Sequence, residues 1–276
     1  NYLNVPQVIS TERPDKAANH ILSGRVVVIV NGSPYVLIMP CVFVDFLSSA
    51  EDPNLKFQYA NLLKFVRLVA FFITLLLPGL YVAITNFHQE IIPTELLFAI
   101  VASRESVPFP IIVEILAMEI SFELIREASL RVPSPIGTTI GIIGALILGQ
   151  AAVEASIVSP ILIIIIAIPG ITSFAIPDFY LSFHLRIARF LYIIAGFLAG
   201  FLGIGIVLFG HLILLCSLKS FGVSYLAPYI PATSKNNKAY FMPPFWNREK
   251  RPDFLNSQRP RKQERVSMNW KYKVDN

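Results

Sequence analysis

Two long apolar runs follow each other along the chain with almost no polar residue between them. They read IGTTIGIIGALILGQAAVEAS over residues 136–156 and VSPILIIIIAIPGITSFAIP over residues 158–177. A helix needs about 20 residues to cross a hydrocarbon layer roughly 30 Å thick. The pattern therefore predicts two membrane-crossing helices joined by a tight corner.

Two further apolar runs, at 66–87 and 188–217, predict a membrane helix on either side of this pair. Pro78-Gly79 lies near the centre of the first and predicts a kink, because proline removes a backbone hydrogen bond. The last run would measure roughly 45 Å as a straight helix, so we expect it to lean or to project from the bilayer. About four spans follow from these runs.

The region 91–131 is too charged to cross a bilayer in the same way and predicts amphipathic helices. Glu119, Glu123 and Glu127 recur every fourth residue of a helix over 111–131 and so form one acidic stripe. Such a stripe either draws cations toward a vestibule or is an ordinary solvated face. We expect this helix to be interfacial or re-entrant.

Residues 1–60 have a different pattern, which predicts the end of a cytoplasmic α+β domain. Two β-branched runs flank Asn31-Gly32 and predict a β-hairpin over 25–46, since both turn residues tolerate positive φ. Pro40 restricts the second strand to a sheet edge or ends it early. A short helix is expected before the hairpin.

Composition agrees with a membrane protein. The chain has 276 residues, of which 54% are hydrophobic and 15% are charged, and its mean hydropathy is +0.61. The core of a soluble protein of this size does not bury so much apolar surface. The expected fold class is mainly α, a polytopic helical membrane protein with a small N-terminal α+β piece. Because the first residue is Asn1, we expect a fragment of a longer chain.

Positive charge is concentrated at the end of the chain. From Ala232 onward there are eleven Lys or Arg and four Asp or Glu, whereas the whole chain has a net charge of +5. Because Lys and Arg gather on the cytoplasmic side of membranes, this predicts a basic cytoplasmic tail over 231–276 rather than nucleic-acid binding. The domain boundaries are then 1–60, a membrane domain at 61–230, and the tail. Both flanks lie on one side, which requires an even number of crossings.

Small residues mark two candidate helix-packing faces. In the second span they recur every fourth residue, at Gly137, Gly141, Ala145 and Gly149. The last span has a GxxxG match formed by Gly196 and Gly200, a weak signal because glycine is frequent in membrane helices. Close helix packing is the favoured interpretation over a gating surface.

Gln150 and Glu154 are the leading candidates for chemistry inside the membrane. They lie one helical turn apart at the end of the span 136–156. If their face lines a pore, an oligomer would place Glu154 in a ring of carboxylates that attracts cations. The alternative is hydration at the headgroup level.

The sequence gives no sign of an enzyme, a metal site or a cofactor. It contains no nucleophile elbow and no phosphate-binding loop. The four histidines, at 20, 88, 184 and 211, have no neighbouring ligand at helical spacing. Cys41 and Cys216 are interpreted as free thiols.

The chain resembles the A subunit of the GerA family of spore germinant receptors. The resemblance rests on IPTELLFAIVASRESVPFP, EISFELIREASLRVPSPIG, TIGIIGALILGQAAVEASIVSP, ITSFAIPDF and PPFWNREKRP. It implies a multi-pass protein of the spore inner membrane that contacts lipid and works with a transporter-like B subunit and a lipoprotein C subunit. It further implies a homo-oligomer around a pore that releases monovalent cations when a nutrient binds.

Two other functions remain open. Pro78-Gly79 and Pro169-Gly170 form a pair of broken helices such as secondary transporters use, although the flanking sequences do not repeat. A scaffold that only holds the receptor complex together is the third possibility.

Overall fold

The computed structural model describes residues 5–131, 136–232, 240–242, 251–255 and 257–258. The chain divides into two units, and each contains segments that are distant in sequence. The mixed unit comprises Asn1–Val69, Ile176–His184 and Gly210–Asn276, and the helical unit comprises Ala70–Ala175 and Leu185–Phe209. Two long helices, α3 (Phe57–Phe87) and α8 (Phe179–Ser217), have residues in both units.

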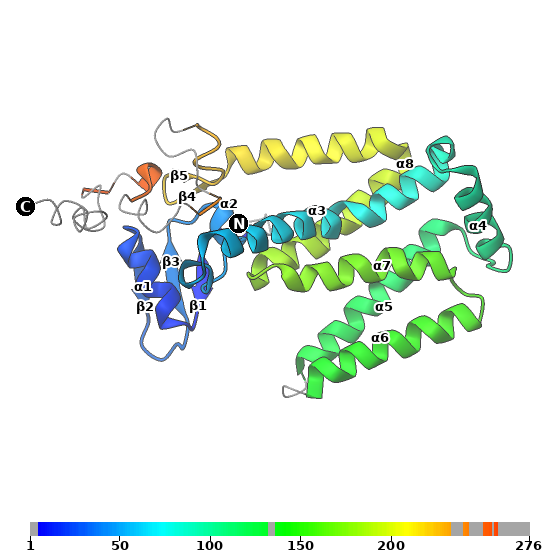
Figure 1. Ribbon diagram of the computed structural model, residues 1–276, viewed down its shortest axis with the longest axis horizontal. Helices are drawn as coiled ribbons and strands as arrows, with labels where there is room; N and C mark the ends of the chain where they lie inside the picture. Colours follow the sequence, from blue (N-terminus) through cyan, green and yellow to red (C-terminus); the bar gives the residue numbers. More distant parts are fainter. Residues whose placement is uncertain (1–4, 132–135, 233–239, 243–250, 256, 259–276) are drawn as a thin grey trace, which may run out of the picture. The chain divides into compact units, whose positions relative to one another are not determined.

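A three-stranded antiparallel sheet with the order β1-β3-β2 forms the centre of the mixed unit (Figure 1). Its strands are β1 (Ile9–Thr11), β2 (Val26–Ile29) and β3 (Val36–Met39), and α1 (Pro14–Leu22) joins the first two. The predicted hairpin is confirmed as β2–β3, and Gly32 has a φ of +85° in its turn. The second strand ends just before Pro40 and lies in the middle of the sheet, because β1 pairs with its other edge.

The residues after β3 form a short helix, α2 (Phe43–Phe46), rather than a longer strand. Asp45 stabilises its start, since Oδ2 accepts a hydrogen bond from the amide of Val42 at 2.8 Å. Arg25 donates to the other oxygen at 2.8 Å. Burial alone would raise the pKa of Asp45, but the charge and hydrogen bond of Arg25 lower it below its ordinary value.

The chain returns to this sheet after α8. The strands β4 (Lys219–Ser220) and β5 (Val223–Ser224) pair with each other. The hydroxyl of Ser220 accepts from the amide of Cys41 at 3.1 Å and donates to the carbonyl of Gln7 at 2.7 Å. Tyr225 is fully buried, and its ring lies 6.0 Å from that of Phe46. The segment after α8 therefore shares one core with the sheet within the mixed unit.

The helical unit contains parts of α3 and α8 and the helices between them. These are η2 (Gln89–Ile91), α4 (Thr94–Arg104), α5 (Ile111–Arg131), α6 (Ile136–Glu154), α7 (Pro160–Thr172) and η3 (Ser173–Ala175). Helix α5 packs against both α6 and α7 (Figure 1). The core of this unit is mainly aliphatic and includes Val82 of α3, Ile115 of α5, Leu162 of α7 and Ile193 of α8, each fully buried.

Helix α8 is interrupted at Ala199 and Gly200. Gly200 has a φ of +58° and a ψ of −138°, a conformation that glycine adopts readily because it has no Cβ. The chain reverses at this point, so the second half of α8, drawn in yellow, runs back along the first (Figure 1). The backbones touch, since a Cβ on Gly203 would lie 2.2 Å from the carbonyl oxygen of Ala195. One leaning helix over 188–217 is therefore not what forms.

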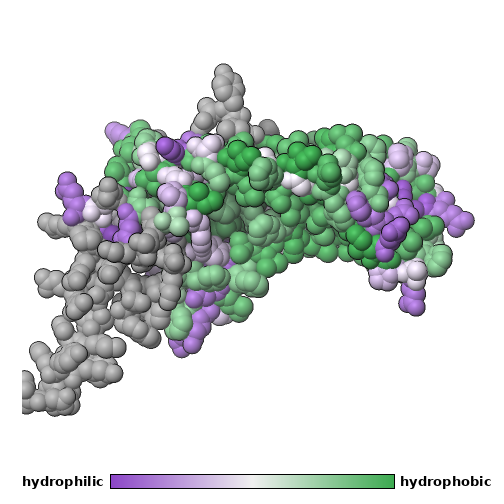
Figure 2. Space-filling model, turned by 90° about the horizontal axis from the view of Figure 1, so that it is seen from above, coloured by the Kyte–Doolittle hydropathy of each residue, from purple (hydrophilic) through white to green (hydrophobic). Residues whose placement is uncertain are grey.

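Among the described residues, α3 and α8 are long and apolar enough to cross a membrane. The exposed surface of the helices is itself hydrophobic (Figure 2). On α8 the outward side chains include Leu198, Leu202, Ile206 and Phe209, which are 64% to 70% exposed. A lipid environment accounts for such a surface, whereas water does not.

Candidate functional site

Two carboxylates of helix α5 point inward, whereas several of its aliphatic side chains are exposed. Glu114 and Glu119 are each 1% exposed, whereas Ile120 is 51% and Leu124 is 66% exposed. This is the reverse of an amphipathic helix on a soluble protein, in which charged residues face water. Buried charges in such a position need partners from other helices.

Two arginines of α8 supply partners for two of these carboxylates. Arg189 Nη2 lies 2.6 Å from Glu119 Oε2, and both side chains are at most 4% exposed. One turn along each helix, Arg186 forms an ion pair with Glu123. The spacing of four residues on α5 matches the spacing of three on α8, so both pairs lie on one contact face.

Arg126 adds a third guanidinium to this site. Its Nη2 donates to the carbonyl of Gly170 at 3.2 Å, and its guanidinium carbon lies 5.0 Å from the ring centroid of Phe174. It is also within electrostatic range of Glu123 and Arg186. Arg126 therefore connects the paired charges to the end of α7.

We call the five side chains Glu119, Glu123, Arg126, Arg186 and Arg189 the α5–α8 charge cluster. Two carboxylates and three guanidinium groups leave one excess positive charge. Removing one partner of a buried ion pair costs about 3–5 kcal/mol, because the other charge remains buried without compensation. The cluster therefore favours one arrangement of α5 against α8 strongly.

A separate ion pair fixes the other end of α5. Glu114 Oε1 lies 3.1 Å from Arg104 Nη2 at the end of α4, and Oε2 accepts from the amide of Ser159 at 3.1 Å. The hydroxyl of Ser159 in turn accepts from the amide of Leu162 and caps α7. Glu114 thus links α4, α5 and the start of α7.

The predicted acidic stripe is brought partly into this site. Glu119 is buried against Arg189, so the interpretation as a solvated face is wrong for this residue; Glu123 pairs with Arg186, but its side chain is 34% exposed. Glu127 is exposed. Gln150 and Glu154 are exposed on α6, of which Glu154 is the last residue.

The small residues of α6 face two different helices. A Cβ on Gly141 would meet the hydroxyl oxygen of Ser129 on α5 at 2.4 Å, and a Cβ on Gly149 would meet Ile163 on α7 at 3.6 Å. Ala145 is half-buried between these positions. Gly137 belongs to α6, but its surroundings lie outside the described residues.

The two glycines of the GxxxG match have different roles. Gly196 packs closely, because a Cβ there would lie 2.6 Å from the carbonyl oxygen of Gly79 on α3. Gly79 is equally tight, with Tyr192 O at 2.7 Å from its ideal Cβ. Gly200 instead provides the reversal of α8 and lies against Phe87 and His88.

Sequence reasoning missed the arginine partners Arg104, Arg186 and Arg189. Arg186 and Arg189 were available as a signal, since two arginines three residues apart beside an apolar run share one helix face. Their partners lie 63 and 70 residues earlier in the chain, which no local pattern connects.

The model of the family described as "Bacillus/Clostridium GerA spore germination protein" matches residues 1–254. The chain belongs to the GerA family. Among its relatives, "Spore germination protein KA" of Bacillus subtilis (strain 168) is 46% identical over 258 residues, which is 93% of this chain. "Spore germination protein GerLA" of Bacillus cereus is 41% identical over 91% of the chain.

A third relative of this GerA-family chain, from Bacillus subtilis (strain 168), is named "Uncharacterized membrane protein YfkQ" and is 42% identical over 91% of the chain. The chain spans 47% to 51% of the length of these three relatives. No solved structure matches it significantly.

Proposed function

We propose that this chain is part of a non-enzymatic subunit of a nutrient germinant receptor that triggers bacterial spore germination. Membership of the GerA family supports this, as do the names of relatives such as "Spore germination protein KA". The receptor would lie in the inner membrane of the spore. Its other members would be a transporter-like B subunit and a lipoprotein C subunit.

The exposed stripe of α6 supports a channel built from several copies of the subunit. Ile143, Leu146, Ile147, Gln150 and Glu154 recur at helical spacing and are all exposed. An apolar stripe that ends in an amide and a carboxylate can meet the same stripe of other copies around an axis. Several copies would then place Glu154 in a ring that selects cations.

The α5–α8 charge cluster could hold such a channel in its closed arrangement. It locks α5 to α8, and α5 packs directly against α6. A nutrient bound to a partner subunit would open the channel only if its affinity differs between the two arrangements. Loosening of the cluster would let α5 and α6 shift together.

The reversal of α8 changes the proposed number of crossings. If each half of α8 crosses the membrane, two cytoplasmic flanks require one further crossing to keep the number even. Helix α5 provides it, because its 21 residues span the required length and, apart from Glu127, its exposed side chains are apolar. The proposed passes are therefore α3, α5, α6, α7 and the two halves of α8.

The test is the release of monovalent cations from spores whose full-length receptor carries Glu154→Gln. We expect a slower or less cation-selective release after addition of nutrient. Glu105→Gln is the matched control, since Glu105 is exposed beyond the end of α4, and it should behave as the unmodified receptor. Unchanged rate and selectivity in the Glu154 variant would remove that residue from a pore.

Reconstitution with the B and C subunits separates the alternatives. A channel requires several copies and passes ions down their gradient. Accumulation of nutrient by a single copy would instead favour a secondary transporter. Complete receptors that trigger no ion movement through this subunit would favour a scaffold.

A further inference from the structure

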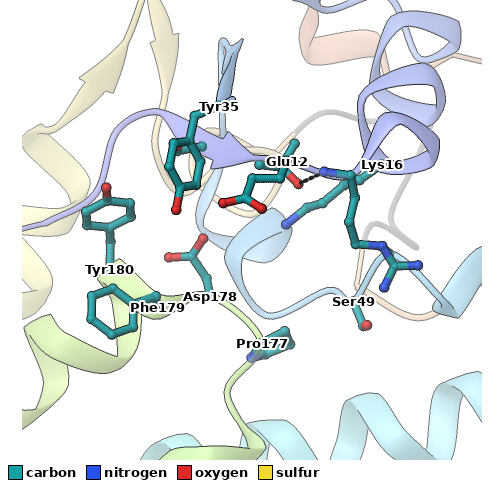
Figure 3. Close-up of a pocket in the computed structure, with 12 residues that line it drawn as sticks. Glu12, Lys16, Tyr35, Ser49, Pro177, Asp178, Phe179 and Tyr180 are labelled. Carbon is teal, nitrogen blue, oxygen red and sulfur yellow. Dashed lines mark hydrogen bonds between the residues drawn. The ribbon is translucent and has the colours of Figure 1, made fainter. Parts of the chain in front are cut away.

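The mixed unit contains a cavity of about 440 Å³ that the proposed function does not use. It lies where β1 leads into α1, beside the β2–β3 turn and the start of α8 (Figure 3). Its lining combines charged and aromatic side chains, among them Glu12, Lys16, Tyr35, Asp178 and Tyr180. Its chemistry is therefore that of a binding site rather than of an apolar packing gap.

Two carboxylates face this cavity. Asp178 is only 5% exposed; its Oδ1 accepts from the amide of Leu181 at 2.9 Å and caps α8. Figure 3 shows its carboxylate and that of Glu12 directed into the same space. Among the described residues, neither has a lysine or arginine nitrogen within 4 Å. Burial raises the pKa of Asp178, although the Leu181 amide and the charge of Lys16 lower it.

The positively charged side chains described around the cavity do not neutralise the carboxylates of Glu12 and Asp178. Arg13 is already bound to Asp15 at 2.8 Å and to Glu51 at 3.2 Å. Lys16 remains, and it forms no ion pair with the described residues. Two carboxylates against one available ammonium leave the cavity negative, which favours a cationic occupant.

The aromatic side chains that line the cavity also favour a cationic occupant. Tyr35, Phe179 and Tyr180 surround the carboxylates from two sides (Figure 3). Ring faces attract cations, and the attraction is strongest when the cation is partly desolvated. The neighbouring carboxylate of Glu12 raises the pKa of Tyr35, so the phenol keeps its proton and remains a hydrogen-bond donor.

We propose that this cavity binds a small organic cation, a protonated amine, between the carboxylates of Glu12 and Asp178 and the rings of Tyr35 and Tyr180. Among the described residues, no three His, Cys, Asp or Glu side chains come together to hold a metal ion. An anion is repelled by both carboxylates, and a neutral molecule gains nothing from their charge. The amine is carried either by a soluble molecule or by the headgroup of a lipid.

Equilibrium dialysis of labelled ethanolamine against the purified full-length protein in detergent tests the proposal. We expect saturable binding that weakens about tenfold or more in Glu12→Gln and in Asp178→Asn, because each removes a charge-assisted hydrogen bond. Asparagine also caps helices, so Asp178→Asn keeps the start of α8. Glu95→Gln, a matched change at an exposed position of α4, should leave binding unchanged.

Lys16→Gln should change the affinity for ethanolamine in the opposite direction. A misfolded variant would not bind more tightly, so this result distinguishes an effect of charge from misfolding. Removing the competing ammonium should tighten the binding of ethanolamine. Saturable acetate binding that is lost in Lys16→Gln would overturn the proposal in favour of an anion site. An absence of saturable ethanolamine binding to the folded protein would overturn it as well.

Nanodiscs distinguish the two sources of the amine. If discs that contain phosphatidylethanolamine compete with labelled ethanolamine and discs of phosphatidylglycerol do not, the headgroup occupies the cavity. If neither competes while ethanolamine still binds, the occupant is a soluble amine. Because these assays measure binding and not ion release, their failure is distinguishable from failure of the proposed channel.

Discussion

Nε2 of His184 lies 3.3 Å from Nε2 of His211, although 27 residues separate them within α8. A continuous helix would hold them roughly 40 Å apart at 1.5 Å per residue. The contact therefore depends on the reversal at Gly200. Each half of α8 is long enough to be a separate pass in the proposed topology.

Cross-linking tests this reversal. With Cys216→Ser as background, His184→Cys together with His211→Cys should be joined by a short bifunctional maleimide within one chain. Proteolysis between the two positions should then leave the fragments linked. The controls are the two variants that carry only one of these substitutions. Fragments that separate in the double variant would contradict the hairpin.

Exchange of charges tests the α5–α8 charge cluster. Glu119→Gln leaves Arg189 buried without its carboxylate and should lower the free energy of unfolding by about 3–5 kcal/mol. The reciprocal swap, Glu119→Arg with Arg189→Glu, should recover part of this loss. Thermal unfolding in detergent measures both. Glu105→Gln, at an exposed position, should change stability by less than about 0.5 kcal/mol, and an equal loss there would refute the special role of the cluster.

A single methyl group tests the close approach of α3 and α8. Gly196→Ala would place Cβ 2.6 Å from the carbonyl oxygen of Gly79, and such overpacking typically costs about 1–3 kcal/mol. Gly205→Ala is the matched control on the same helix, because nothing lies within 4 Å of its Cβ. Thermal unfolding should separate the two variants. Equal stability would mean that the helices can move apart at no cost.

The pH dependence of amine binding follows from Asp178. Because its pKa is raised above the ordinary value of 3.8, Asp178 takes up a proton at a higher pH than an exposed aspartate. Only the ionised form attracts an ammonium group, so binding should be complete above the raised pKa and weaken as pH falls through it. Dialysis of ethanolamine as a function of pH measures this. In Asp178→Asn the part of the transition that Asp178 causes should be absent.

The hairpin shows how far local pattern extends. The turn at Asn31-Gly32 and the early end of the second strand at Pro40 follow from residue chemistry alone, and both are confirmed. The central position of β3 does not follow, because it depends on pairing with Ile9–Thr11 across α1. Residues 43–46 read as a strand but form a helix, since Asp45 caps the amide of Val42.

The helices show the same division. Periodicity predicted that Glu119 and Glu123 share a face, and they do. Whether that face points to solvent or to another helix could not be predicted locally, because its arginine partners lie 63 and 70 residues away. The last run contains several glycines, and the sequence does not show which of them forms a turn and which forms a packing contact. The structure shows that Gly200 forms the turn.

A mainly helical protein, a β-hairpin and membership of the GerA family follow from the sequence, because composition, turn chemistry and similarity to relatives can be read without knowing which residues meet in space. The fold of α8 back on itself, and the pairing of its arginines with carboxylates of α5, became known only from the three-dimensional structure. The physical reason is that a buried charge needs a counter-charge in space. The chain can supply it from any distance in sequence.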